Sequence, residues 1–314
     1  MSPQIFLWIG FAALVIIMMA LDLGVFHRKA HEVRFKEALG WSIVWLLLAV
    51  IFNIGVYIWR GAGPSTEFAA AYLLEESLSI DNLFVFLLIF NYFKVPKTYQ
   101  HSILFWGIIG VMVLRGIFIA AGITLLNRFE WIIYVFGAML IMTAVKLALE
   151  KDKEIEFEKN IILKLCRRFI PVTESYEGAA YWVRKNGRLL ATPLLIILIL
   201  VDITDVIFAV DSIPAVLAIS RDPFIVYTSN TFAILGLRSL YFVLAHIMGL
   251  FHHLHYGLAV ILAFIGIKML LSNVYHIPTA ISLLFTLLTL VISVIVSIIW
   301  PNTKKETTST TTKG

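Results

Sequence analysis

Long apolar runs recur along the chain and restrict it to one class of fold. Each run holds about 18 or more residues between charged or Pro/Gly-rich segments, enough for a helix to cross a hydrocarbon core of about 30 Å. The chain is 60% hydrophobic and only 14% charged, whereas soluble domains have about 25% charged residues. We therefore predict an all-α polytopic membrane protein with about nine transmembrane helices. They lie at roughly 4–26, 38–59, 68–93, 103–126, 131–149, 190–219, 228–250, 256–273 and 278–300.

The basic residues are sorted by loop. Eighteen Lys and Arg lie in the loops and the tail that follow the odd-numbered runs. Three, Arg60, Arg128 and Arg221, lie in the loops that follow the even-numbered runs. The positive-inside rule then predicts an outside N-terminus and a cytoplasmic C-terminus in a bacterial-type inner membrane. The net charge of +5 thus reflects topology, and we expect no nucleic-acid partner. No basic residue precedes the first run, so we expect a transmembrane helix there and not a cleaved signal.

The runs group into six segments. A single cysteine, Cys166, excludes internal disulfides and thiolate metal clusters from all of them. The chain has one long loop, at about 150–188. We expect it to hold a charged helix and a basic, lipid-facing linker; the alternative is a docking site for a secretory or membrane partner. The segments are two N-terminal helices (1–62), a three-helix unit (63–150), a basic cytoplasmic loop (151–188), a second three-helix unit (189–275), a last helix (276–301) and a disordered tail (302–314).

Two of these segments resemble each other. The acidic stretch EESLSIDN (75–82) matches DVIFAVDS (205–212) in the spacing of its acids and of the small polar residue that follows. Arg115 precedes Lys146 by 31 residues, much as Arg238 precedes Lys268 by 30. Because three helices are an odd number, the second copy would enter the membrane from the other side. This predicts an inverted 3+3 repeat, which many secondary transporters contain; chance likeness between two apolar triplets is the alternative.

Acidic side chains inside the runs need an explanation, since a carboxylate at the bilayer centre costs about 2.5–3.5 kcal/mol. The apolar runs contain seven acidic and four basic residues, so three acids stay unpaired even if every base pairs with one acid. A buried unpaired carboxylate either takes up a proton or holds a cation. The acids are Asp22, Glu75, Glu76, Asp81, Asp202, Asp205 and Asp211, and their candidate charge partners are Arg115, Arg238, Lys146 and Lys268.

The ligands in the two acidic stretches are all oxygen atoms. Carboxylate, amide, hydroxyl and carbonyl groups suit Mg²⁺, Ca²⁺ or Mn²⁺ better than zinc or copper. Helical geometry turns Asp81 and Asp211 about 120° away from the other acids of their stretches, so a straight helix cannot aim all of them at one ion. Pro214 is expected to kink the sixth run, which is too long for one straight helix, just beyond Asp211. A purely stabilising polar network is the alternative.

Other polar residues are weaker candidates. Asp22 lies near the end of the first run and is either interfacial or an additional ligand. Glu76 either adds to the site, pairs with a base or lies at the interface. His252, His253 and His255 form a cluster that can bind a metal or serve as polar turn residues.

The acidic stretches also resemble a known family. EESLSIDNLFVF (75–86) and DITDVIFAVDSIPAV (202–216) are similar to the two signature segments of the TerC family, named for tellurium resistance. The segments ALDLGVFHRKAHEVRFKEALGWS and YFKVPKTYQHSILFWGI resemble its longer, Alx-type branch, and the resemblance spans roughly 5–300. It implies a LysE-type transporter with inverted three-helix repeats. Carried over to this chain, the family's metal ligands are Glu75, Asp81, Asp202, Asp205 and Asp211, with Asn82 and Ser212 as neutral ligands.

The resemblance also narrows the function. Several TerC proteins are associated with manganese efflux, others with metal supply for secreted enzymes and with tellurite resistance. We therefore predict a divalent-cation exporter, with Mn²⁺ ahead of Ca²⁺ or Mg²⁺, no tightly bound cofactor, and inward protons as a possible driving partner. The alternatives are an organic-cation exporter and a membrane scaffold or metallochaperone that docks through loop 150–188. No nucleophile–base set, phosphate loop or redox motif indicates an enzyme. Glu76 stands where many relatives are expected to have lysine.

Overall fold

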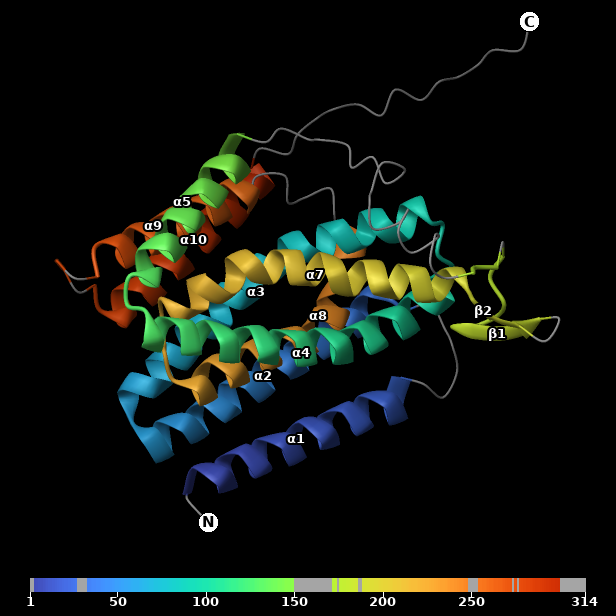
Figure 1. Ribbon diagram of the computed structural model, residues 1–314, viewed down its shortest axis with the longest axis horizontal. Helices are drawn as coiled ribbons and strands as arrows, with labels where there is room; N and C mark the ends of the chain where they lie inside the picture. Colours follow the sequence, from blue (N-terminus) through green and yellow to red (C-terminus); the bar gives the residue numbers. More distant parts are fainter. Residues whose placement is uncertain are drawn as a thin grey trace, which may run out of the picture.

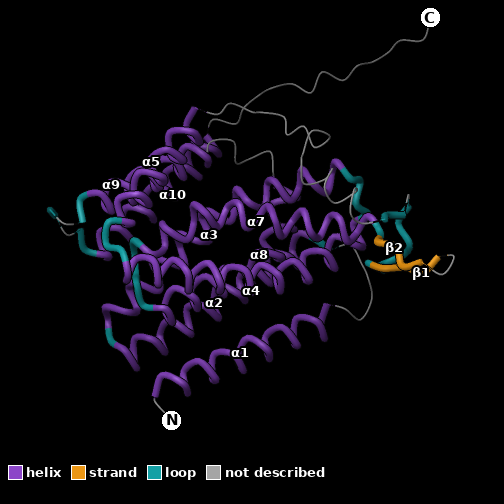
Figure 2. Tube along the Cα trace, in the orientation of Figure 1, coloured by secondary structure: helices purple, strands orange, loops and turns teal. Residues whose placement is uncertain are grey.

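The computed structural model consists of α-helices and one small hairpin (Figures 1 and 2). It describes residues 3–26, 33–149, 171–173, 175–185, 188–247, 254–272, 274–275 and 277–299. Within them the elements are α1 (Pro3–Phe26), α2 (Phe35–Arg60), α3 (Ala62–Tyr92), α4 (Lys97–Arg128), α5 (Ile132–Leu149), β1 (Trp182–Lys185), β2 (Arg188–Ala191), α7 (Pro193–Leu217), α8 (Pro223–Ile247), α9 (Leu254–Leu270) and α10 (Thr279–Ile299). The nine described helices confirm the all-α membrane fold predicted from the nine apolar runs.

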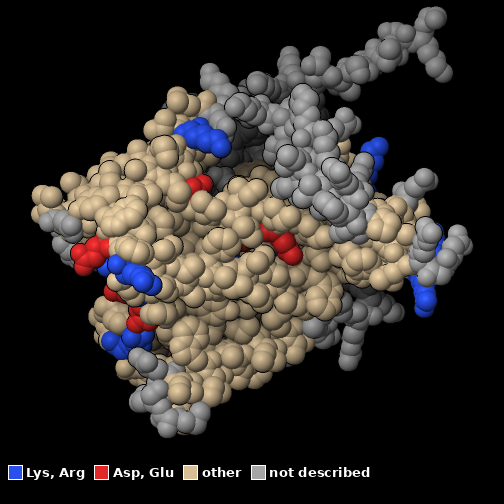
Figure 3. All heavy atoms as spheres, viewed as in Figure 1, with Lys and Arg blue, Asp and Glu red and all other residues tan. Residues whose placement is uncertain are grey.

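The outer surface of the bundle is suited to lipid. Five of the described helices, α2, α4, α5, α7 and α10, are long and apolar enough to cross a membrane. Large apolar side chains lie exposed on them, for example Ile51 at 63%, Ile117 at 61% and Met142 at 67%. Figure 3 accordingly shows a face that is mostly uncharged. A soluble protein rarely exposes so continuous an apolar surface.

The helix pairs are arranged in a regular way. α3 packs on α8 and α4 packs on α7, while α5 packs on α9 and α10 lies against α3 and α9. Figure 1 shows α5, α9 and α10 as a group set at an angle to the longer helices. Exchanging the unit α3–α5 with the unit α7–α9 interconverts the first two pairs and preserves the third. Any two-fold-related repeat produces such exchangeable pairs, so the inverted repeat itself stays a prediction.

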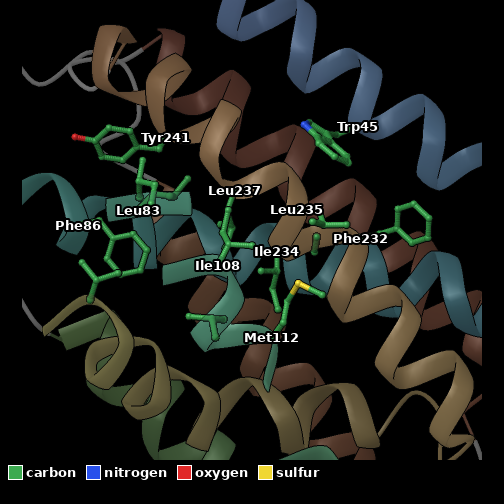
Figure 4. Packing of buried hydrophobic residues seen from close by; sticks show 14 of the residues in the cluster. Trp45, Leu83, Phe86, Ile108, Met112, Phe232, Ile234, Leu235, Leu237 and Tyr241 are labelled. Atoms are coloured by element: carbon green, nitrogen blue, oxygen red, sulfur yellow. The ribbon is translucent and has the colours of Figure 1, made fainter. Parts of the chain in front are cut away.

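α8 is largely enclosed by α2, α3 and α4. Nearly every residue of α8 from Phe224 to Ser239 is buried. Figure 4 shows how its apolar side chains meet those of α2, α3 and α4. Lipid is as apolar as leucine, so close packing and polar contacts between helices carry much of the association in a membrane. The labelled core residues include Trp45, Leu83, Phe86, Ile108, Met112, Ile234 and Leu237.

Glycines allow α5 and α9 to approach closely. A Cβ atom built at Gly266 would lie 2.8 Å from the carbonyl oxygen of Gly137 and 2.8 Å from Cγ1 of Ile141. Neither Gly137 nor Gly266 has room for a side chain unless α5 and α9 separate. Small residues at such crossings are typical of membrane helix pairs.

We expect Gly266→Ala to lower the free energy of unfolding by about 1–3 kcal/mol, because the added methyl group forces the α5–α9 contact apart. Unfolding in mixed detergent micelles measures the change. Gly40→Ala is the matched control, since no atom lies within 4 Å of the added Cβ there. An equal loss in both variants would contradict close packing at Gly266.

Several helix boundaries differ from the sequence prediction, by up to six residues. α3 and α4 begin six residues before the predicted runs at 68 and 103, since the polar segments before these runs remain helical. The predicted sixth run began at 190, and its first residues are instead in β2. α7 then passes through Pro214 as one α-helix and ends one turn later at Leu217. Pro214 therefore marks the end of the helix and does not break it at Asp211.

The structure adds a hairpin to the last part of the loop predicted between the two units. β1 and β2 form an antiparallel hairpin across residues predicted as a linker, with Lys185 paired to Arg188. The Tyr176 hydroxyl donates to the Phe93 carbonyl at 2.8 Å, and Tyr181 and Ser102 share a hydrogen bond of 3.0 Å. The hairpin segment is thus fastened to the ends of α3 and α4. Residues 150–170, where a charged helix was predicted, and the tail from 300 lie outside the described residues.

Candidate cation site

Arg115 of α4 gathers two of the predicted acids at the centre of the bundle. Its Nε and Nη2 donate to the two carboxylate oxygens of Asp205, each at 2.9 Å. Its Nη1 pairs with the Glu75 carboxylate and lies 3.5 Å from Oδ1 of Asn230. All four side chains are at most 2% exposed. We call Glu75, Arg115, Asp205 and Asn230 the arginine cluster; it joins α3, α4, α7 and α8.

The arginine cluster balances its charges only in part. One guanidinium faces two carboxylates, so the group has one formal negative charge in surplus. Glu75 Oε2 and Asn230 Nδ2 are buried without a hydrogen-bond partner among the described residues, and the same is true of Ser79 Oγ, one turn along α3. Unpaired polar atoms in such a place are costly. The cluster is nevertheless filled by its own arginine, and this argues against a metal ion at its centre.

Three of the other predicted ligands line a separate cavity of about 170 Å³ between α3, α5 and α7. Asn82, Asp211 and Ser212 contribute polar atoms from the two motif helices, and Thr143 contributes one from α5. The Thr143 hydroxyl donates to Oδ1 of Asp211 at 2.9 Å, and Ser212 Oγ is buried without a partner among the described residues. We call Asn82, Thr143, Asp211 and Ser212 the oxygen pocket. Lys146 and apolar side chains of α3, α5, α7 and α9 complete its wall.

The oxygen pocket has the chemistry of a hard-cation site with few charges. It offers one carboxylate, one amide and two hydroxyls, the ligand types that Mg²⁺, Ca²⁺ and Mn²⁺ accept. Among the described residues, no three Asp, Glu, His or Cys side chains come together as a metal-binding group. A cation in this pocket would therefore keep part of its water shell. Asp81 precedes Asn82 on α3, but its side chain lies outside the part that the structure describes.

Asp202 belongs to neither group, although it lies three residues before Asp205 on α7 and within electrostatic reach of it. Its side chain rests against α4, where a Cβ atom at Gly110 would come within 2.7 Å of its Oδ2. Its Oδ1 is buried without a hydrogen-bond partner in the described part of the chain. Figure 3 shows acidic atoms in the middle of the uncharged face, where α4 and α7 meet. The structure therefore does not bring Asp202 to the oxygen pocket.

The remaining candidates are dispersed. Glu76 accepts a hydrogen bond from the Tyr72 hydroxyl at 2.8 Å and faces Gly236 of α8. Arg238 is buried in α8, and Lys268 donates to Ser282 Oγ at 3.0 Å. The side chains of Asp22 and His255, like the whole of His252 and His253, lie outside the described residues.

Sequence analysis missed Thr143 and Asn230. Thr143 is an isolated neutral residue in α5 and Asn230 stands in the polar run TSNT (228–231) of α8; neither has a repeat partner. Thr143 had one usable signal, because it lies three residues before Lys146 and hence on the same helix face. Asn230 had no such signal.

Comparison with known proteins identifies the family. Residues 60–307, most of the chain and both acidic stretches, match the model described as the integral membrane protein TerC family. The chain belongs to the TerC family. This establishes a multi-pass integral membrane protein and confirms the resemblance seen in EESLSIDNLFVF and DITDVIFAVDSIPAV. No solved structure matches the chain.

Bacterial members of the TerC family are similar over almost their whole length. The membrane protein STKORF319 of Myxococcus xanthus is 52% identical over 277 residues, which cover 88% of this chain and 87% of that protein. Alx of Salmonella typhi, named as a proposed membrane-bound redox modulator, is 46% identical over 309 residues and 96% of each chain. Alx of Escherichia coli K12 is 48% identical over 286 residues, covering 88% and 89%.

Proposed function

We propose that this protein is a transporter that exports a divalent cation from the cytoplasm, with Mn²⁺ as its cargo. The observation that carries the proposal is the oxygen pocket: both motif helices place polar side chains at one cavity inside a membrane-spanning bundle. The ligand chemistry limits the cargo to hard cations. The choice of manganese rests on the resemblance to TerC proteins associated with manganese efflux.

The proposed location is the bacterial inner membrane, with the N-terminus outside and the C-terminus in the cytoplasm. The distribution of eighteen basic residues against three supports this orientation. In it, the hairpin and the start of α7 face the cytoplasm, and the Ser220–Glu67 hydrogen bond of 2.5 Å ties α7 to α3 at the outer end. Exposure of the oxygen pocket to the two sides in turn would move the ion by alternating access.

The arginine cluster and the oxygen pocket would have different roles in transport. The arginine cluster joins four helices through buried contacts and would act as the fixed centre. The oxygen pocket has one wall made by α5, outside that cluster, and would change its accessibility. Inward protons are the proposed driving partner, because the Asp211 carboxylate can accept either a proton or a metal ion but not both.

The test is Mn²⁺ flux from proteoliposomes that contain the purified full-length protein. We expect flux that exceeds that of protein-free liposomes, and that stops when an ionophore collapses the pH gradient. Flux that is indifferent to the gradient would reject proton coupling and keep the exporter. Binding of Mn²⁺ without flux would favour the scaffold or metallochaperone, and flux of organic cations alone would favour the organic-cation exporter.

A further inference from the structure

Among the described residues, Lys146 is the one basic residue that lines the oxygen pocket. It lies three residues after Thr143, so α5 presents the hydroxyl and the ammonium on the same face. Thr143 already donates to Oδ1 of Asp211. The described contacts leave Oδ2 of Asp211 as the oxygen that a cation can approach.

Lys146 and Asp211 line the same pocket and carry opposite charges. Among the described residues, however, Lys146 forms no direct ion pair or hydrogen bond. Lys268, the other lysine of the bundle, differs because it donates to Ser282 Oγ. The ammonium of Lys146 therefore shares a pocket with the Asp211 carboxylate and is not fixed there by a contact of its own.

A divalent cation and the ammonium of Lys146 would compete for the same carboxylate. Like charges in a low-dielectric cavity repel strongly, so a bound metal would drive the ammonium away. The flexible four-carbon stem of lysine permits this movement. α5 ends at Leu149, less than one turn beyond Lys146, so the side chain can extend toward the polar boundary of the membrane.

We propose that Lys146 is a tethered counter-ion, which neutralises Asp211 while the pocket is free of metal and is displaced when a divalent cation binds. It thereby lowers the affinity of the pocket and speeds release of the ion. This inference rests on the proposed function and adds to it a residue that sets affinity. A site with an unopposed carboxylate would hold its cargo more tightly and turn over more slowly.

The test is calorimetric titration of the purified full-length protein with Mn²⁺. We expect Lys146→Met to lower Kd at least tenfold, because the competing charge is removed while most of the stem is kept. We expect Lys146→Arg to stay close to wild type. In stopped-flow mixing with a chelator, Lys146→Met should release Mn²⁺ more slowly by a similar factor. Lys185→Met, which removes the same charge at the hairpin, should change neither value.

Unchanged or weaker binding by folded Lys146→Met, with normal binding by wild type, would overturn the counter-ion role and leave the exporter intact. Lys146→Gln serves as a second neutral variant if Lys146→Met does not fold. Absence of Mn²⁺ binding by wild type, or equal binding by wild type and Asp211→Asn, would overturn both the inference and the proposed site.

Discussion

Replacing Arg115 by methionine is expected to lower the free energy of unfolding by about 3–5 kcal/mol, the loss typical of a broken buried ion pair. The variant removes a guanidinium that is 1% exposed and leaves the carboxylates of Glu75 and Asp205 without their cation. Two carboxylates in a dry interior would have to take up protons or draw in water. Unfolding in mixed detergent micelles measures the loss.

Two further variants make this prediction specific. Arg128→Met removes an exposed arginine at the end of α4, and we expect a change below about 0.5 kcal/mol. Adding Asp205→Asn to Arg115→Met should recover part of the loss, since it removes one of the two uncompensated charges. Equal losses for Arg115 and Arg128, or strictly additive effects in the double variant, would show that the cluster does not hold the bundle together.

Replacing Asp211 by asparagine is expected to reduce Mn²⁺ flux at least about 100-fold, equivalent to about 2.8 kcal/mol. The change removes the one charged ligand of the oxygen pocket and keeps the size of the side chain. The Thr143 hydroxyl can still donate to the amide oxygen, so the pocket should keep its shape. Flux from proteoliposomes, normalised to the amount of inserted protein, provides the measurement.

The matched control for Asp211 is Glu177→Gln, which removes one negative charge from an exposed pair with Lys185 at 2.6 Å. Its flux should equal that of wild type. If Asp211→Asn transports at the wild-type rate, the oxygen pocket is not the ion site. If it fails to insert or unfolds, the pocket is structural and the purely stabilising network is correct.

The sequence predicted the helices well because membrane-length apolar runs leave few other solutions. It missed the hairpin, although Asn186–Gly187 between β1 and β2 is a strong two-residue turn signal. The sequence assigned seven residues to one site, whereas the described contacts divide them between the arginine cluster and the oxygen pocket and place Asp202 in neither. Arg115 could have paired with any of several acids, and only the tertiary packing brings it to Asp205 of α7 and Glu75 of α3. Thr143 enters through the packing of α5, which no pattern along the chain encodes.

The most direct measurement is the anomalous scattering of Mn²⁺ in crystals of the full-length protein. The account predicts one manganese peak in the oxygen pocket, bonded to Asp211 and absent from Asp211→Asn crystals, with the Lys146 ammonium turned away from it. A peak inside the arginine cluster or at Asp202, or identical peaks in both proteins, would contradict it.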